Sequence, residues 1–336
     1  MAANFDPPST LKPAQVAAAM IEHGVVKHRT RADVVFFKAV AAGVMLSFGG
    51  LLSEIVSGGS AGINASNPGL VKFLGGAVFP VGLIMIVLQG QELLTSNMMV
   101  SHALADVGPI LTFAFKIYPM ACIRGAVPWW GLLYNWLIVT FGNLCGSLFF
   151  ASVLTKYTGI ISTPPYNAYA VTFAMHKAVE PEWHQIFLRG IGCNWLVCVA
   201  VWQAAGARDT ISKIVALWVP IMIFVTCGYD HVVANMFSVP LGILFGADLT
   251  VAGYIRKSLI AAYLGNIVGA LLVALPAIYF FAPQYTPASA LRQVEEGEGF
   301  NGGAGPSAGA RGSSSEENMN EKRPADVYEA DSRRSQ

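Results

Sequence analysis

An aspartate and a histidine stand side by side between two long apolar stretches of this sequence. Asp230 and His231 are preceded by the uncharged residues 214–229 and followed by the uncharged residues 232–247. A histidine titrates near neutral pH, so it can donate a hydrogen bond to an anion or exchange a proton with it. An ionisable side chain within a membrane is costly and usually functional. His231 is therefore the first candidate site residue, and a hydrogen-bonded core histidine is the structural alternative.

A second acid occupies a matching place earlier in the chain. Glu92 follows Gly90 by two residues, just as Asp230 follows Gly228. The glycines allow the chain to leave helical geometry, and a carboxylate placed there can cap the helix that resumes. We expect both acids to cap and brace broken helices, with direct contact to a cargo as the alternative. Thr95 lies nearby, where its hydroxyl either bonds the backbone or points into a path.

The elements that must position these residues are membrane-spanning helices. The chain has 336 residues, of which 54% are hydrophobic and 12% charged, whereas a soluble domain carries about 25% charged residues. Backbone polar groups must be satisfied inside lipid, so spans are helices of roughly 20 residues. Six stretches qualify, at about 36–56, 73–106, 131–154, 185–205, 214–247 and 258–282.

The composition argues against several other classes of protein. The net charge of +1 offers no basic surface for nucleic acid. Among the five cysteines, Cys193 and Cys198 have neither metal-site nor CxxC spacing. No Ser–His or paired catalytic aspartate pattern accompanies His231 in the apolar segments. We therefore expect no metal, no cofactor and no enzymatic activity.

Charges outside the apolar stretches predict the orientation and the ends of the chain. Basic residues precede the first span, which predicts a cytosolic N-terminal segment over residues 1–35. Six spans return the C-terminus to the cytosol. Residues 283–336 are rich in Gly, Ser, Glu and Arg, so we expect a disordered cytosolic tail. The pore domain then covers 36–282, and a glycosylation sequon at Asn64 falls outside the cell.

The chain contains two related halves, at about 36–155 and 185–282. Residues 87–98 match residues 225–236 at a shift of 138, which aligns Asn97 with Asn235. Each half has three spans, so the second half enters the membrane from the opposite side. Transporters with such inverted repeats often bind their cargo near the midplane, between half-helices. Leu93 stands where the second half has His231, so the histidine is not a symmetric feature of the scaffold.

A second match between the halves is the motif GNxxG, at 142–146 and 265–269. Small residues let membrane helices pack closely. We expect Asn143 and Asn266 to make hydrogen bonds between helices.

Longer motifs resemble one known family. FxxGLxxxxxxGxELxTxN (79–97), CNxLVCxAVW (193–202) and GxDHxxANMF (228–237), together with the two GNxxG sequences, are similar to the formate–nitrite transporter family. The resemblance covers about residues 12–282, and the long polar tail is most like the fungal nitrite transporters.

The resemblance implies an aquaporin-like, all-α membrane fold with six transmembrane helices, inverted repeats and breaks in helices 2 and 5. It also implies a homopentamer in the plasma membrane, with a pore in each protomer. Two apolar constrictions would flank the central histidine. Phe79 and Leu83 would belong to the cytoplasmic constriction, with Thr95 on a mobile loop, and Phe224 would belong to the outer constriction.

The resemblance implies roles for two more residues. Asn194 would lie beside the histidine, and Lys177 would attract anions at the outer vestibule, although its spacing to Asn194 is one residue longer here. Gln91, Leu94 and Asp230 depart from the residues usual in the family, which bears on gating and substrate preference.

The resulting hypothesis is transport of a small weak-acid anion, nitrite or formate, linked to protons and to nitrate assimilation. An aquaporin-like channel for small neutral solutes is the alternative, favoured by the paired Asn97 and Asn235. The midplane His231 and Lys177 argue against it.

Overall fold

The computed structural model describes residues 10–99 and 129–282, and apart from an isolated β-bridge between Thr10 and Ala207 their regular elements are all helices. Within these residues, six helices are long and apolar enough to cross a membrane. They are Ala32–Gly58, Pro68–Leu88, Trp130–Lys156, Trp183–Gly206, Thr210–Cys227 and Val251–Phe281. The predicted number of six spans is confirmed, although the second predicted span (73–106) runs beyond the described residues and the fifth (214–247) also takes in the shorter apolar helix Val232–Leu244. The predicted tail, 283–336, lies outside the described residues.

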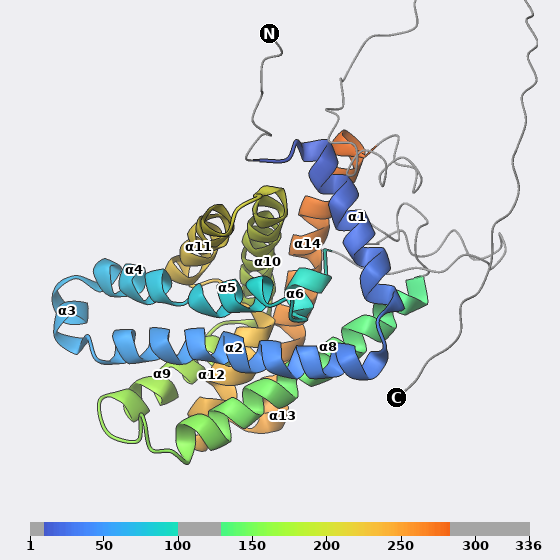
Figure 1. The fold of residues 1–336 in the computed structure, drawn as a ribbon. Coiled ribbons are helices and arrows are strands. Elements are labelled where there is room, and N and C mark those ends of the chain that lie inside the picture. The colour runs from blue at the N-terminus through green and yellow to red at the C-terminus, as the bar shows by residue number, and fades with distance from the viewer. Residues whose placement is uncertain (1–9, 100–128, 283–336) are drawn as a thin grey trace, which may run out of the picture.

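The helices form two sets, one for each half of the chain, with a similar order of elements (Figure 1). The first set is α1 (Pro13–Arg29), α2 (Ala32–Gly58), α3 (Ala61–Ser66), α4 (Pro68–Val78), α5 (Val81–Leu88), α6 (Leu94–Asn97) and α8 (Trp129–Phe149), which continues as the π-helical η1 (Phe150–Lys156). The second set is α9 (Tyr166–Ala178), α10 (Trp183–Gly206), α11 (Thr210–Cys227), α12 (Val232–Leu244), α13 (Val251–Gly253), the π-helical η2 (Tyr254–Leu259) and α14 (Ile260–Phe281).

Helices 2 and 5 of the six are broken where the glycines predict it. The chain leaves helical geometry between α5 and α6 and again between α11 and α12. Gly90 has a φ of 65° and Gly228 a φ of 80°, a left-handed conformation that residues with a Cβ rarely adopt. Each break places backbone groups and polar side chains within the bundle.

The two sets cross the bundle in opposite directions. Helix α2 starts directly after α1, and the end of α10 lies against the start of α1, where the Leu11 N–H donates to the Gly206 carbonyl at 2.8 Å. Figure 1 shows α1 along one end of the bundle and α3 and α9 at the other end. Helix α2 therefore runs away from α1, whereas α10 runs toward it, as an inverted repeat requires.

Glycines of the GNxxG motif hold equivalent helices close together in each half. A Cβ on Gly146 would lie 2.0 Å from the Val40 carbonyl oxygen, so α8 presses directly on α2. A Cβ on Gly269 would lie 2.3 Å from the Ile191 carbonyl oxygen, so α14 presses on α10. These contacts confirm the packing role expected for small residues.

The N-terminal region is more ordered than its polar composition suggests. Residues 1–35 are predicted to form a polar segment ahead of the pore, but 17 of them, Pro13–Arg29, form the helix α1. Four apolar residues of α1 are buried in the main core: Val16, Ala17, Met20 and Ile21. The helix therefore packs across one end of the bundle.

Candidate functional site

His231 lies at the start of α12, directly after the second break. Its Nδ1 accepts a hydrogen bond from the Ala234 N–H at 3.0 Å, so the imidazole itself caps the helix. Its Nε2 lies 2.8 Å from the hydroxyl of Thr95 on α6. Because Nδ1 is an acceptor, the ring proton sits on Nε2 and is donated to the Thr95 oxygen. The two breaks thus meet at one hydrogen bond.

Two asparagines hold the backbone at the breaks. Asn143 on α8 accepts from the Leu94 N–H at 2.9 Å and donates to the carbonyl of Glu92. Asn266 on α14 accepts from the Val232 N–H at 2.9 Å and donates to the carbonyl of Asp230 at 2.9 Å. The GNxxG asparagines therefore join their own half's third span to its broken helix.

This arrangement corrects the capping role predicted for Glu92 and Asp230. Neither carboxylate accepts a hydrogen bond from a backbone N–H in the first turn of the helix that follows it; Leu93 and His231 occupy the N-cap positions. Each acid instead faces a lysine: Glu92 pairs with Lys27 at 2.8 Å, and Asp230 pairs with Lys177 at 3.0 Å. A buried ionised carboxylate needs a cation more than it needs a backbone N–H.

The two ion pairs are equivalent in the two halves. Asn97 donates to Glu92 at 2.7 Å, and Asn235 donates to Asp230 at 3.4 Å. We call Lys27, Glu92 and Asn97 the first clamp, and Lys177, Asp230 and Asn235 the second clamp. Each clamp ties the helix that precedes its half to the break in that half.

Lys27 is a site residue that no motif in the sequence singles out. The signal was present, since both clamp lysines lie within the last turn of the helix preceding their half. The halves were aligned on their breaks at a shift of 138, however, whereas Lys27 and Lys177 are 150 positions apart. A single shift therefore cannot align both the breaks and the two lysines.

Lys177 also completes the end of α11. Its Nζ donates to the carbonyls of Gly228 at 3.1 Å and Tyr229 at 3.0 Å, which the helix leaves unpaired. Lys257 on η2 donates in the same way to the carbonyl of Val179, directly after α9.

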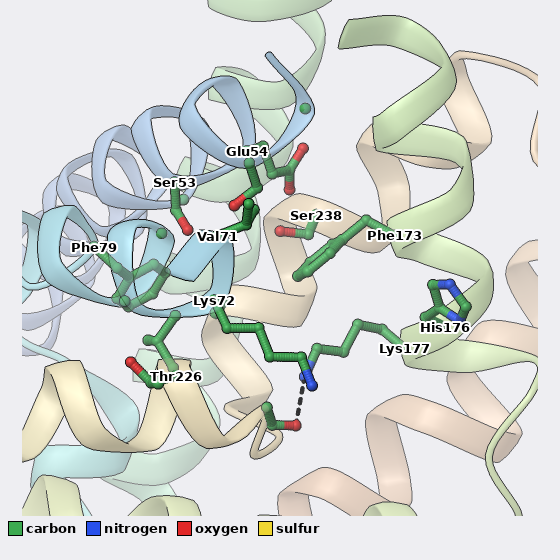
Figure 2. Close-up of a pocket in the computed structure, with 18 of the residues that line it drawn as sticks. Ser53, Glu54, Val71, Lys72, Phe79, Phe173, His176, Lys177, Thr226 and Ser238 are labelled. Atoms are coloured by element: carbon green, nitrogen blue, oxygen red, sulfur yellow. Dashed lines mark hydrogen bonds between the residues drawn. The ribbon is translucent and has the colours of Figure 1, made fainter. Parts of the chain in front are cut away.

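A cavity of about 420 Å³ leads from the end of the bundle opposite α1 to the histidine. We call this cavity the vestibule. Its wall includes Phe79, Phe224, Lys177 and His231, but not Leu83, Thr95 or Asn194. Figure 2 shows the side chains of Lys72 and Lys177 extending into it from opposite sides.

Two phenylalanines narrow the vestibule beside the histidine. The rings of Phe79 and Phe224 meet edge to face with centroids 5.8 Å apart, and Phe224 stacks on the His231 imidazole at 5.8 Å. The expectation that Phe79 and Phe224 line opposite constrictions is therefore wrong. The turn between α4 and α5 brings Phe79 to the vestibule side, while Leu83, one helical turn later, is buried in the core.

Asn194 reaches the histidine only indirectly. Its amide donates to the Asn266 carbonyl at 2.8 Å and to the Thr95 carbonyl at 3.3 Å. It therefore joins α10, where it is fully buried, to Thr95 on α6 and to the backbone of α14.

Two vestibule residues were not found from the sequence, Lys72 and Glu54. Lys72 is an exposed lysine on α4 within the second span, and Glu54 is a buried acid on α2 within the first span. A charge inside an apolar stretch was the available signal for both, but neither belongs to a motif. In the described part of the chain, no cluster of three or more His, Cys, Asp or Glu side chains could hold a metal ion.

Comparisons with known proteins identify the family. The family model described as "Formate/nitrite transporter" matches residues 14–109 and 108–280. The chain belongs to the formate/nitrite transporter family. A probable formate transporter of Methanothermobacter thermautotrophicus is 38% identical over 271 residues, covering 76% of this chain and 92% of that protein. A formate channel of Bacillus thuringiensis, BtFdhC, is 37% identical over 77% of this chain and 90% of its own length.

Solved structures agree on the fold of the transporter. A pentameric formate channel with formate bound superposes with a TM-score of 0.62 at 30% identity, covering 74% of this chain and 96% of that chain. A family ion channel at 24% identity gives a TM-score of 0.63 and supports the fold alone. The six-helix, aquaporin-like architecture is thereby confirmed.

Proposed function

We propose that this transporter is a pore for small monovalent weak-acid anions, formate and nitrite, and that their movement is linked to protons. The observation that carries the proposal is the vestibule, which is lined by both Lys72 and Lys177 and ends at His231. Relatives named as formate channels or formate transporters support formate as a cargo. Nitrite rests on the family and on the resemblance of the tail to fungal nitrite transporters, and with it a role in nitrate assimilation.

The linkage to protons follows from the cost of charge beside apolar rings. A bare anion loses most of its hydration where Phe79 and Phe224 meet, whereas a protonated weak acid loses much less. The two lysines raise the local concentration of anions, and the N-terminus of α12 adds positive potential. The pore therefore attracts the anion and passes the neutral acid.

The hydrogen bonds of His231 favour water as the nearer source of that proton. With Nδ1 accepting from Ala234, the imidazole is held neutral, and its remaining proton is donated to Thr95. The hydrogen of the Thr95 hydroxyl is then free to be donated to a cargo oxygen. We call the narrow part of the pore beside Phe79, Phe224 and His231 the neck. In this proposal His231 and Thr95 hold the cargo at the neck, and the proton arrives from the aqueous side.

The arrangement of the transporter in the cell is part of the proposal. Basic residues gather at the end of the bundle where α1 lies, with Arg208 and Lys213 at the start of α11 beside it, which favours this end for the cytosol. We infer a homopentamer in the plasma membrane with both termini cytosolic and the vestibule facing outward. The pentameric formate channel supports this assembly.

A channel for neutral solutes is the alternative, and the hydrogen bonds within the two clamps argue against it. Such a channel would use Asn97 and Asn235 as paired donors at its centre. Here the amide of Asn97 donates to Glu92 and the amide of Asn235 donates to Asp230. Each amide therefore donates within the scaffold, although Asn235 also lines the vestibule.

The test is the flux of formate and nitrite into proteoliposomes, with and without an inward proton gradient. We expect the wild-type chain to move both anions faster with the gradient, and His231→Asn to lower the flux about tenfold or more. His184→Asn, at an exposed histidine of α10, is the matched control and leaves the flux unchanged. If His231→Asn conducts like the wild type, the histidine only caps α12. If neither anion moves in the wild type, the proposed function is wrong.

A further inference from the structure

A carboxyl group without a hydrogen-bond partner lies in the wall of the vestibule. Glu54 on α2 is 5% exposed, and no described group hydrogen-bonds either of its oxygens. Ser238 on α12 faces it and interacts with it electrostatically, but outside hydrogen-bond geometry (Figure 2). The transport route described above does not use Glu54.

The isolation of this carboxyl sets it apart from the two clamp acids. Glu92 and Asp230 each have a lysine within 3.0 Å, whereas no described cation lies within ion-pair distance of Glu54. A buried ionised carboxylate without a partner costs several kcal/mol. Glu54 must therefore obtain a proton or a donor from whatever occupies the vestibule.

The groups around Glu54 favour exchange with an anion. Lys72 on α4 and Lys177 on α9 line the same cavity and draw anions into it. Burial raises the pKa of Tyr169, interaction with the Ser57 hydroxyl opposes this shift, and the nearby Glu54 carboxyl raises the pKa further. Tyr169 thus keeps its proton and does not compete with Glu54 as a proton donor to the anion. The titratable groups in the wall facing Glu54 are Lys72, Tyr169, His176, Lys177, Tyr229 and His231.

We propose that Glu54 is the proton-exchanging residue of the vestibule and gives its proton to the weak-acid anion before the anion reaches the neck. The O–H bond of the Glu54 carboxyl breaks, and an O–H bond forms on a formate or nitrite oxygen. The neutral acid continues toward His231, and the Glu54 carboxylate takes a new proton from hydronium at the open end of the vestibule. No electrons are exchanged. This inference rests on the proposed function.

The test compares Glu54→Gln with the wild type in the full-length chain. Initial rates of formate uptake into proteoliposomes are measured at external values between about pH 5 and 8 with the internal pH fixed. We expect the wild-type rate to fall through a titration midpoint as pH rises. Glu54→Gln is about tenfold slower at the acidic end and lacks that midpoint, while its retention on size-exclusion chromatography matches the wild type. Glu54→Asp, which keeps a carboxyl, retains a midpoint.

The control is Asp248→Asn, which removes an exposed acid that follows α12 and lies outside the vestibule wall. It should leave the pH profile unchanged. Two results overturn the inference while sparing the proposed function: a Glu54→Gln profile equal to the wild type, or a Glu54→Gln variant that is faster at alkaline pH. The second result would make Glu54 an electrostatic barrier. A wild type that takes up no formate defeats the proposed function and this inference together.

Discussion

Single residues decide what the neck of this transporter can offer to an anion. The imidazole of His231 uses one nitrogen to cap α12 and the other to hold Thr95. In the proposed function, this side chain both builds the scaffold and meets the cargo. The structural and functional interpretations of this histidine, which the sequence left as alternatives, are compatible.

Replacing Thr95 tests the neck. Thr95→Val keeps the shape but removes the hydroxyl that accepts from His231, and leaves the buried Nε2–H without a partner. We expect formate flux to fall about tenfold and the midpoint of thermal unfolding to drop, at a cost of about 1–3 kcal/mol. Thr95→Ser restores the hydroxyl and should recover most of the flux. Equal flux in Val and Ser variants would show that the hydroxyl does not face the cargo.

Lys72 should act through long-range attraction. Lys72→Met removes an exposed charge from the vestibule wall without touching either clamp. We expect lower uptake at low ionic strength, and a difference from the wild type that shrinks as salt screens the charge. Uptake measured at several salt concentrations checks this. A loss that is independent of salt would mean that Lys72 contacts the cargo directly.

At the scale of the elements, two of the six spans are broken, and the sequence predicted the position of each break. Gly90 and Gly228 both lie at breaks. These positions were predictable because the spacing from each glycine to an acid and an asparagine recurs in both halves. The direction in which Glu92 and Asp230 point was not predictable from that spacing. It depends on Lys27 and Lys177, which lie on α1 and α9 and reach the breaks only in the folded bundle.

Backbone strain at the second break can be isolated. Gly228→Ala places a Cβ at a φ of 80°, although nothing lies within 4 Å of it. We expect a loss of about 1–2 kcal/mol from conformation alone. Gly62→Ala on α3 is the matched control, because its Cβ also meets nothing and its backbone is ordinary. Thermal unfolding in detergent should separate the two; equal midpoints would contradict the strain argument.

The first clamp should matter for the fold. Lys27→Met leaves the Glu92 carboxylate buried beside Asn97 without its cation. We expect a loss of about 3–5 kcal/mol. The double variant Lys27→Met/Glu92→Leu removes both charges and should be less unstable than the single variant. Thermal unfolding compares them, and a double variant that is the less stable of the two would count against a buried ion pair at this break.

Over the whole molecule, sequence patterns predicted the six spans, the inverted halves and the central histidine, because each depends on hydrophobicity or on local spacing. The placement of Phe79 and the isolation of Glu54 depend on how α4 and α2 face the vestibule. That relation between distant helices is set by tertiary packing. Helix α1 was missed although Val16, Ala17, Met20 and Ile21 recur on one helical face.

The number of chains in the assembly is also a property of the whole molecule. We predict that the purified transporter carries five copies of the chain, as the similar pentameric formate channel does. Native mass spectrometry in detergent measures the number of copies directly. A monomer that still transports formate would show that each protomer contains a complete pore without the pentamer.

The most direct test of the central claim is the steady-state accumulation of formate in proteoliposomes under a pH gradient with the voltage clamped, and then under a voltage with the pH equal on both sides. A pore that passes the neutral acid should accumulate formate about tenfold per unit of pH difference, since one unit corresponds to about 1.4 kcal/mol. It should not respond to voltage. Accumulation that follows the voltage and ignores the pH difference would mean that the bare anion crosses the neck, and would contradict the account.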